Sequence, residues 1–517
     1  MSPGERTLVS AREHRDDEAA DTAGAGVGRA ATGGVVWLTA QKWAVRLFGF
    51  VTIAILTRLL SPADFGTLAA ASTVLPFFYL LADLGFAAYI VQADKVTDRL
   101  LSTAFWFSIS AGTVLCGALW LCAPLMGAVF GNDDVTPVLR VLSLWVIFTA
   151  LGSVPMALMR REMRFGVIAA QGAAAAVAAQ IVAIVLAFAG FGVWTLVAQS
   201  LVAAVLTTIL IWCASSWRPR WMLDIGELGR LSSFGGKVLG VEFVAMSRAW
   251  GETAITSAVL GAAALGAQSI AQRLVQIVQD LTGSAVVPVT NVAFAKLRNE
   301  VDRLRTSYLR ALKLVILVLS LPLTVVAVCA PLLVPLLFGP GWEQSIPVAQ
   351  VLALAGVLAV AAWLDHGLFY GIGRPGTWFV YALVVDAVTV ATTAMTVRWG
   401  LVVIAYGFLG VTIVATVSRW FLVRGVLGVR LRALIMPFLC LITVVVLSGT
   451  AGLVVMSLTA ELPHIAALLI VVPAIGLVHV GVSVVCARPV IIDALLMVRA
   501  SRWGARLPGL QRMGRVR

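Results

Sequence analysis

Successive apolar segments dominate this 517-residue chain, and each is long enough to cross a lipid bilayer as a helix. A crossing needs about 20 apolar residues, because a helix rises only ~1.5 Å per residue. About fourteen such segments lie at 33–60, 65–91, 101–126, 137–159, 165–188, 192–213, 232–259, 266–294, 310–337, 346–370, 376–397, 400–423, 434–456 and 464–487. They are continuous runs and not ten-residue alternations, which excludes a membrane β-barrel. The sequence therefore predicts an all-α polytopic membrane protein.

The distribution of basic residues predicts the orientation. Only 12% of the residues are charged, yet the net charge is +13. Besides the two tails, the basic residues cluster in loops after even-numbered segments: Lys95, Arg99, Arg160, Arg161, Arg164, Arg218, Arg220, Arg230, Lys296, Arg298, Arg303, Arg305, Arg310, Arg374, Arg424, Arg430 and Arg432. In the opposite loops, Arg398 is the basic residue. The positive-inside rule places both tails in the cytoplasm of a bacterial inner membrane, so the charge reflects topology and predicts no nucleic-acid partner.

Two stretches match at an offset of 200 residues. Residues 59–66 and 259–266 each form a tight turn after a segment that begins at a glycine pair. The offset spans six helices, an even number, so both copies would run in the same direction. This predicts an N-lobe of helices 1–6 at 33–215, a cytoplasmic linker at 216–231, a C-lobe of helices 7–12 at 232–425 and two appended helices at 426–487. The ends would be a disordered cytoplasmic tail at 1–32 and a basic amphipathic tail at 488–517, which is either an interfacial helix or a solvated segment.

Ionisable residues inside the segments carry most of the functional information. They are Lys42, Arg46, Asp83, Lys237, Glu242, Arg248, Glu252, Arg273, Asp280, Asp365, His366 and Asp386. Each charge costs about 3 kcal/mol at mid-bilayer, so lipid exposure of all of them would exceed the ~5–15 kcal/mol stability of a typical fold. They must therefore face protein or water. A polar stripe at Gln272, Arg273, Gln276, Gln279 and Asp280 supports this conclusion.

Two interpretations of these charges remain open. In the first, a hydrated central cavity binds an anionic or polar cargo through the substrate-binding cations Lys42, Arg46, Arg248 and Arg273. The acidic residues Asp83, Glu242, Glu252, Asp280 and Asp386 would then be cavity partners or coupling groups. In the second, these charges form structural ion pairs between helices. We expect Asp83 to pair with Lys42 at the same depth, and Arg58 and Arg419 to extend from segment ends to the interface.

Motifs for catalysis are missing. Gly236-Lys237 lacks the rest of a phosphate-binding loop, and nucleophile elbows and H-E-x-x-H are absent from the sequence. The six cysteines show no C-x-x-C spacing. We therefore expect no enzyme activity, no cofactor and no metal site.

Three short motifs resemble one family. Residues 56–66, with the sequence LTRLLSPADFG, resemble the R-L-L-x-P-x-D-F-G turn between helices 1 and 2 of Wzx-type polysaccharide flippases. These belong to the multidrug/oligosaccharidyl-lipid/polysaccharide exporter superfamily. Residues 83–86 resemble its D-L-G-F motif, and residues 271–274 with Asp280 are similar to its helix 8. The resemblance covers residues 33–487.

This resemblance implies twelve to fourteen helices in two lobes around a cationic cavity that opens alternately to either side. The implied cargo is an undecaprenyl-pyrophosphate-linked oligosaccharide repeat unit for capsule, exopolysaccharide or O-antigen synthesis, with polysaccharide polymerase machinery as a further partner. The cavity role would fall on Lys42, Arg46 and Arg273, and also on Arg248. A cation-coupled multidrug exporter of the same superfamily is the alternative, and it should have a more apolar pocket. A membrane scaffold is a third class, but it would gain nothing from buried charge.

Overall fold

The computed structural model describes residues 45–83, 86–93 and 96–500. At residues 88, 92, 225, 227–245, 280–289, 291–292 and 487–500 it describes the backbone alone. The predictions for Lys42 and for the two tail ends at 1–32 and 501–517 therefore lie outside the described residues. So do those for the side chains of Lys237, Glu242 and Asp280.

All regular elements of the described chain are helices, which confirms the predicted all-α fold. Residues 45–59 form the first described helix. The others are α2 (Pro62–Asp83), α3 (Phe86–Gln92), α4 (Asp98–Phe130), α5 (Val135–Leu142), α6 (Leu144–Arg161), α7 (Phe165–Phe188), α8 (Val193–Ala214), α9 (Ile225–Leu297), α10 (Val301–Phe338), α11 (Ser345–Gly371), α12 (Pro375–Thr396), η1 (Val397–Trp399), α13 (Leu401–Leu427), α14 (Leu431–Leu458) and α15 (His464–Ala500).

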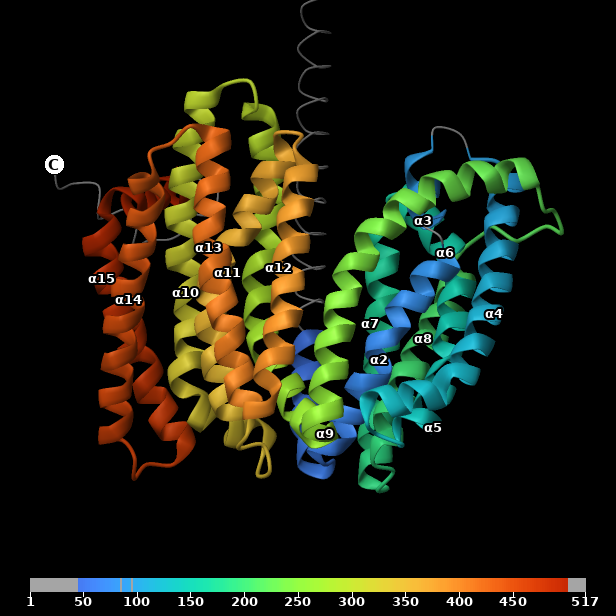
Figure 1. The fold of residues 1–517 in the computed structure, drawn as a ribbon, viewed down its shortest axis with the longest axis horizontal. Coiled ribbons are helices and arrows are strands. Elements are labelled where there is room, and N and C mark those ends of the chain that lie inside the picture. The colour runs from blue at the N-terminus through green and yellow to red at the C-terminus, as the bar shows by residue number, and fades with distance from the viewer. Residues whose placement is uncertain (1–44, 84–85, 94–95, 501–517) are drawn as a thin grey trace, which may run out of the picture.

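Twelve stretches of the described helices are long and apolar enough to cross a membrane. One of them, Met246–Gln279, contains a break at Gly261, where the backbone has a φ of 83° that disfavours other residues. The break divides α9 into two arms, residues 225–260 and 262–297, which form a V in Figure 1. The chain is therefore a multi-pass membrane protein, and the count of fourteen crossings stays a prediction.

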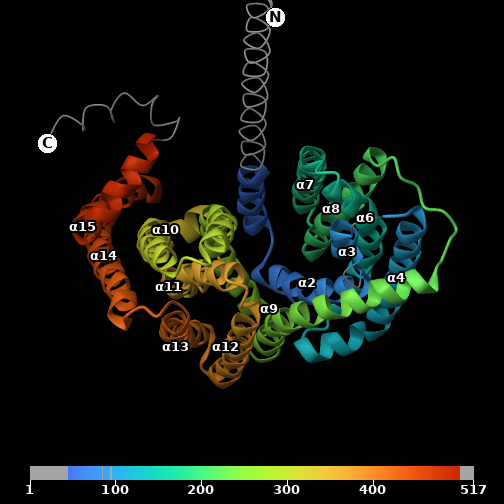
Figure 2. The ribbon, with the colours of Figure 1, turned by 90° about the horizontal axis from the view of Figure 1, so that it is seen from above.

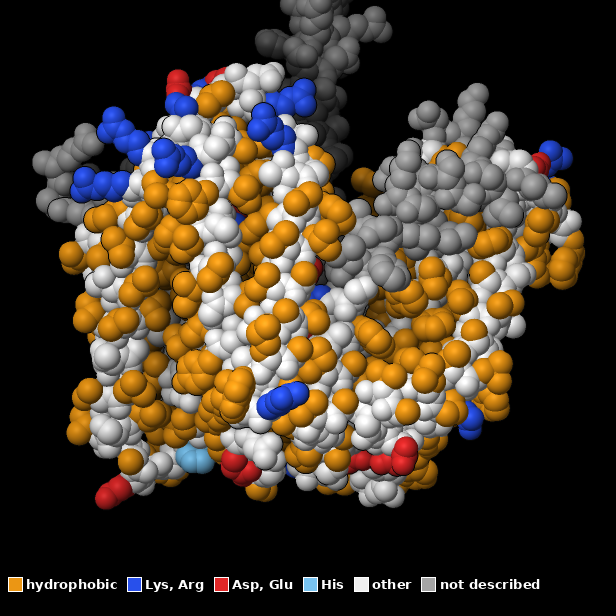
Figure 3. Space-filling model, viewed as in Figure 1, with side chains coloured by type: hydrophobic (Ala, Val, Ile, Leu, Met, Phe, Trp, Pro, Cys, Tyr) orange, Lys and Arg blue, Asp and Glu red, His pale blue; other side chains and the backbone are white. Residues whose placement is uncertain are grey.

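The helices form two groups that diverge toward one end of the molecule. In Figures 1 and 2, α4 to α8 lie on one side and α10, α11, α14 and α15 on the other, with α9 between them. Figure 3 shows Lys and Arg side chains gathered at the end where the groups diverge, whereas Asp and Glu side chains lie at both ends. The sequence-based lobe boundaries remain predictions.

The helix that begins each group packs against the other group at one end. Residues 45–59 pack against α10 and α11, and the first arm of α9 packs against α2, α4 and α5. Trp342, in the loop after α10, donates a 2.9 Å hydrogen bond to the carbonyl of Thr57. Ser257, on the first arm of α9, donates a 2.8 Å hydrogen bond to the carbonyl of Phe130 at the end of α4. The apolar clusters follow the same pattern, since Leu56 packs in the cluster of α10 and α11, and Ala254 in the cluster of α2, α4 and α5. The two groups are thus interlocked at this end.

Candidate translocation cavity

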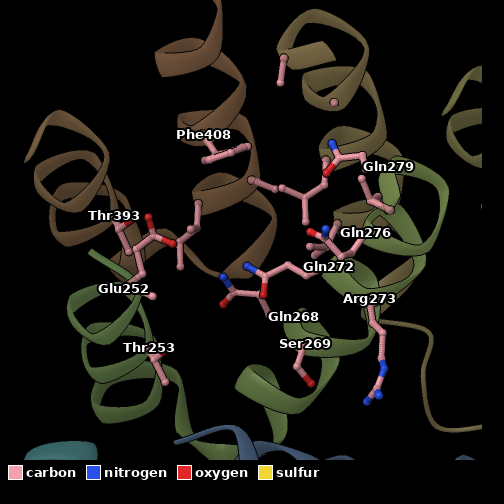
Figure 4. Close-up of a pocket in the computed structure, with 18 of the residues that line it drawn as sticks. Glu252, Thr253, Gln268, Ser269, Gln272, Arg273, Gln276, Gln279, Thr393 and Phe408 are labelled. Atoms are coloured by element: carbon pink, nitrogen blue, oxygen red, sulfur yellow. The ribbon is translucent and has the colours of Figure 1, made fainter. Parts of the chain in front are cut away.

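A cavity of about 650 Å³ lies between the two arms of α9 and helices α11, α12 and α13. This volume falls within the range of about 300–1,000 Å³ that is typical of small-molecule sites. The lining includes charged, amide and aromatic side chains, among them Arg248, Glu252, Gln268, Gln272, Arg273, Gln276, Gln279, Trp363, Thr393 and Phe408. Figure 4 shows most of these side chains and the helices that carry them.

The second arm of α9 supplies one polar wall of this cavity. Gln268, Gln272, Gln276 and Gln279 lie within about 80° of one another on the helix, because successive residues turn by ~100°. The buried residues Ile270 and Leu274 lie on the opposite side of the helix and pack in the apolar core. The predicted polar stripe of this helix therefore lines a cavity at Gln272, Arg273, Gln276 and Gln279.

Arg248 on the first arm lies between two carboxylates. Its Nη1 is 2.8 Å from Oε1 of Glu252, one turn further along the same helix. Its Nε is 2.9 Å from Oδ1 of Asp386 on α12. Three of the predicted site residues thus form one cluster, in which two negative charges offset a single positive charge.

Arg273 lines the same cavity and differs from Arg248 in its partners. Its side chain is exposed, and within the described part of the chain no hydrogen bond or ion pair involves it. In Figure 4 it points away from Gln268 and Gln272. Arg273 is therefore a cation available to an anionic ligand.

Two other predicted residues lie elsewhere. Arg46 is exposed on the first described helix and is not among the residues that line the cavity. Asp83 is 6% exposed at the end of α2 and accepts a 3.3 Å hydrogen bond from the Ala87 amide. Its Oδ1 has no hydrogen-bond partner among the described atoms. The expected pairing of Asp83 with Lys42 stays a prediction, because Lys42 lies outside the described residues.

A buried polar network that the sequence did not reveal connects α10, α11 and α13. The hydroxyl of Tyr308 donates to Asp365, whose other carboxylate oxygen lies 3.6 Å from Nε of Arg419. Arg419 also donates a 2.8 Å hydrogen bond to Thr416. The expectation that Arg419 extends to the interface is wrong, because its side chain is only 4% exposed. The signal in the sequence was Asp365, a carboxylate inside an apolar segment that requires a partner.

The comparisons with known proteins point to polysaccharide synthesis. A family model described as "Polysaccharide biosynthesis protein" matches residues 55–347. The succinoglycan biosynthesis transport protein ExoT of Rhizobium meliloti (strain 1021) is 27% identical over 70% of this chain and 74% of its own length. The lipopolysaccharide biosynthesis protein WzxC of Escherichia coli (strain K12) is 24% identical over 81% of this chain and 87% of its own.

A solved structure shares the fold. The lipid II flippase MurJ in an inward closed conformation superposes with a TM-score of 0.69 and 13% identity. The match covers 88% of this chain and all of that one. At this level of identity the likeness concerns the fold alone.

Proposed function

Because this chain belongs to the family of polysaccharide biosynthesis proteins, we propose that it is a flippase for prenyl-linked oligosaccharide repeat units. Its cargo would be an undecaprenyl-pyrophosphate-linked unit that crosses the bacterial inner membrane by alternating access. The resemblance to Wzx-type flippases at residues 56–66 agrees with the family match, and its relative ExoT is named as a transport protein. The product would be a capsule, an exopolysaccharide or an O-antigen.

The single observation that carries this proposal is Arg273, a cation without a protein partner in the described chain, in a cavity between membrane helices. A pyrophosphate that leaves water loses its hydration, and a guanidinium replaces that hydration with two parallel charge-assisted hydrogen bonds. Arginines within membrane segments typically face a cavity and mark the path of a substrate, because their exposure to lipid is costly. The prenyl chain would remain in lipid, so only the polar part of the cargo needs the cavity.

The arrangement of the two helix groups supports alternating access. Their interlocked end, where the two arms of α9 meet, lies opposite the end where basic side chains gather (Figures 1 and 3). If the positive-inside rule holds, the basic end and both termini are cytoplasmic. The structure would then be closed on the outer side, and rocking of the groups about the cavity would open it there.

A cation-coupled multidrug exporter is the second candidate. Drug sites are mostly apolar and aromatic, with few polar groups. The wall of four glutamines with Arg273, and the ion-paired Arg248 opposite, make this cavity polar and fit a sugar-bearing anion better. A transporter also fits the relatives' names better than a catalyst does.

Deletion of the gene in its own host tests the proposal. Export of the cell-surface polysaccharide should stop, and prenyl-linked repeat units should accumulate in the inner leaflet. Complementation with the intact gene should restore export. Normal export in the deletion strain, with drug sensitivity as its only defect, would instead support the multidrug exporter.

A further inference from the structure

Two glutamine amides in the cavity are not fully satisfied by the protein. Gln268 is only 9% exposed, and its Oε1 has no hydrogen-bond partner among the described atoms. Gln272, one turn further along, is exposed, lines the cavity and makes no hydrogen bond within the described part of the chain. Figure 4 shows both amides extending into the cavity on the side of Glu252. Buried amide oxygens are normally bonded, so a ligand or water is expected here.

The charged cluster on the first arm of α9 is only partly neutralised within the protein. Arg248 is engaged by Glu252 at 2.8 Å and by Asp386 at 2.9 Å, so its cluster carries one net negative charge. Arg273 points away from the two amides. Gln268 and Gln272 therefore extend toward the carboxylate of Glu252 and away from the cation of Arg273.

The two amides and the carboxylate of Glu252 can bind hydroxyl groups better than anions. A carboxamide both donates and accepts, and a carboxylate accepts from several hydroxyls at once. An anionic group placed here would face Glu252, and like charges at short range discriminate strongly against a ligand. Trp363 and Phe408 line the same cavity and offer apolar surface to a sugar ring.

We propose that Gln268, Gln272 and Glu252 form a glycan subsite that accepts a neutral, hydroxyl-rich sugar unit and disfavours a uronic acid. This proposal rests on the flippase function above and specifies the substrate class. The pyrophosphate would bind at Arg273 and the adjacent sugar at the amides. Gln268 and Gln272 would then determine which glycan enters, without contributing to recognition of the lipid carrier.

Binding of three defined lipids to the full-length protein in nanodiscs tests this assignment. The lipids are undecaprenyl pyrophosphate with a neutral trisaccharide, the same lipid with a terminal glucuronate on the trisaccharide, and the lipid without sugar. The wild type should bind the neutral glycan about tenfold more tightly than the acidic one. Gln268→Leu should weaken binding of the neutral glycan about tenfold, the typical effect of one lost hydrogen bond. Binding of the sugar-free lipid should not change.

Two further variants make the test specific. Glu252→Gln combined with Asp386→Asn leaves Arg248 without its carboxylate partners and should reverse the preference toward the glucuronate-bearing lipid. Gln350→Leu is the matched control, because Gln350 bonds the carbonyl of Ala327 and is not among the residues that line the cavity. It should bind all three lipids like the wild type.

The outcomes separate the two proposals. If the wild type binds the neutral and acidic glycan lipids equally tightly, the glycan subsite is wrong and the flippase function stands. The same holds if Gln268→Leu changes the affinity for neither lipid. If the wild type binds none of the three lipids, the flippase function is wrong and the subsite falls with it.

Discussion

Gly66 and Gly266 lie against each other's helix starts in a reciprocal contact. A methyl group on Gly66 would be 1.8 Å from the carbonyl oxygen of Ala262, and one on Gly266 would be 1.8 Å from the carbonyl oxygen of Pro62. Both pairs are related by the offset of 200 residues at which the two turns match in sequence. The contact brings two backbones together as closely as in small-residue helix packing in membranes. It forms the interlocked end of the two helix groups.

Gly66→Ala should therefore disrupt this end of the molecule. The added methyl group meets backbone, which cannot move aside as a flexible side chain can, so the cost should be at least the ~1–3 kcal/mol typical of overpacking. We expect a lower thermal midpoint in detergent and loss of polymer export. Gly117→Ala on α4 is the control, since no heavy atom lies within 4 Å of the added group. Equal stability of the two variants would contradict the close contact.

Removal of Arg248 should leave the carboxylates of Glu252 and Asp386 without their shared partner. Because the arginine side chain is 34% exposed, the loss should fall below the ~3–5 kcal/mol of a fully buried pair. Arg248→Ala should lower stability by ~1–3 kcal/mol, and adding Asp386→Asn should recover part of it. A double-mutant cycle on the purified protein measures this coupling. Additive effects would show that the ion pair is not formed.

The predicted substrate-binding residues Arg273 and Arg46 should be required for export and not for folding. Arg273→Ala and Arg46→Ala should each abolish polymer export while the membrane level of the protein stays unchanged. Arg398→Ala is the control, because Arg398 is an exposed arginine that neither lines the cavity nor belongs to the predicted substrate-binding cations. Export can be scored as surface polysaccharide in a complemented deletion strain. Normal export by the Arg273 variant would remove its assigned role.

The predicted pairing of Asp83 with Lys42 can be tested by exchange of charge. Asp83→Lys should abolish export, since it buries a second cation where the partner is expected to be positive. Adding Lys42→Asp should restore part of the activity, because the opposite charges would meet again. If the double variant is no better than Asp83→Lys alone, the two residues do not pair.

The Tyr308–Asp365–Arg419 network should contribute to stability. Asp365→Ala leaves Arg419 buried without its carboxylate, a change that typically costs about 3–5 kcal/mol. We expect the protein to be scarce in the membrane, whereas Tyr308→Phe should lose only ~1 kcal/mol, the net value of one hydrogen bond. Protein level and thermal midpoint in detergent distinguish these effects. A fully abundant Asp365→Ala variant would contradict the role of the network.

The sequence predicts the features that depend on local pattern. Long apolar runs identify helices because a membrane helix must satisfy its backbone internally. The polar stripe of the second α9 arm is recognisable because its residues recur on one helix face. The ion-pair partners of the charged residues could not be predicted from local pattern. Arg248 pairs with Asp386 on α12, and Arg419 with Asp365 on α11, and only the packed structure brings these distant residues together.

The sequence also could not predict that the first helix of each group packs against the other group. Thr57 bonds the loop after α10, although residues 33–215 read as one continuous set of helices. Such crossing depends on how the helices pack, and apolar faces look alike whichever group they join. The reciprocal glycine contact is a partial exception, because its two turns match at a fixed offset.

Translocation in proteoliposomes tests the central claim most directly. A fluorescent undecaprenyl-pyrophosphate-linked neutral oligosaccharide would be placed in one leaflet, and its appearance in the other leaflet followed with a membrane-impermeant quencher. The account predicts transfer with the wild type and with Arg398→Ala, and none above protein-free vesicles with Arg273→Ala. Transfer by the Arg273 variant at the wild-type rate, or no transfer by the wild type, would contradict it.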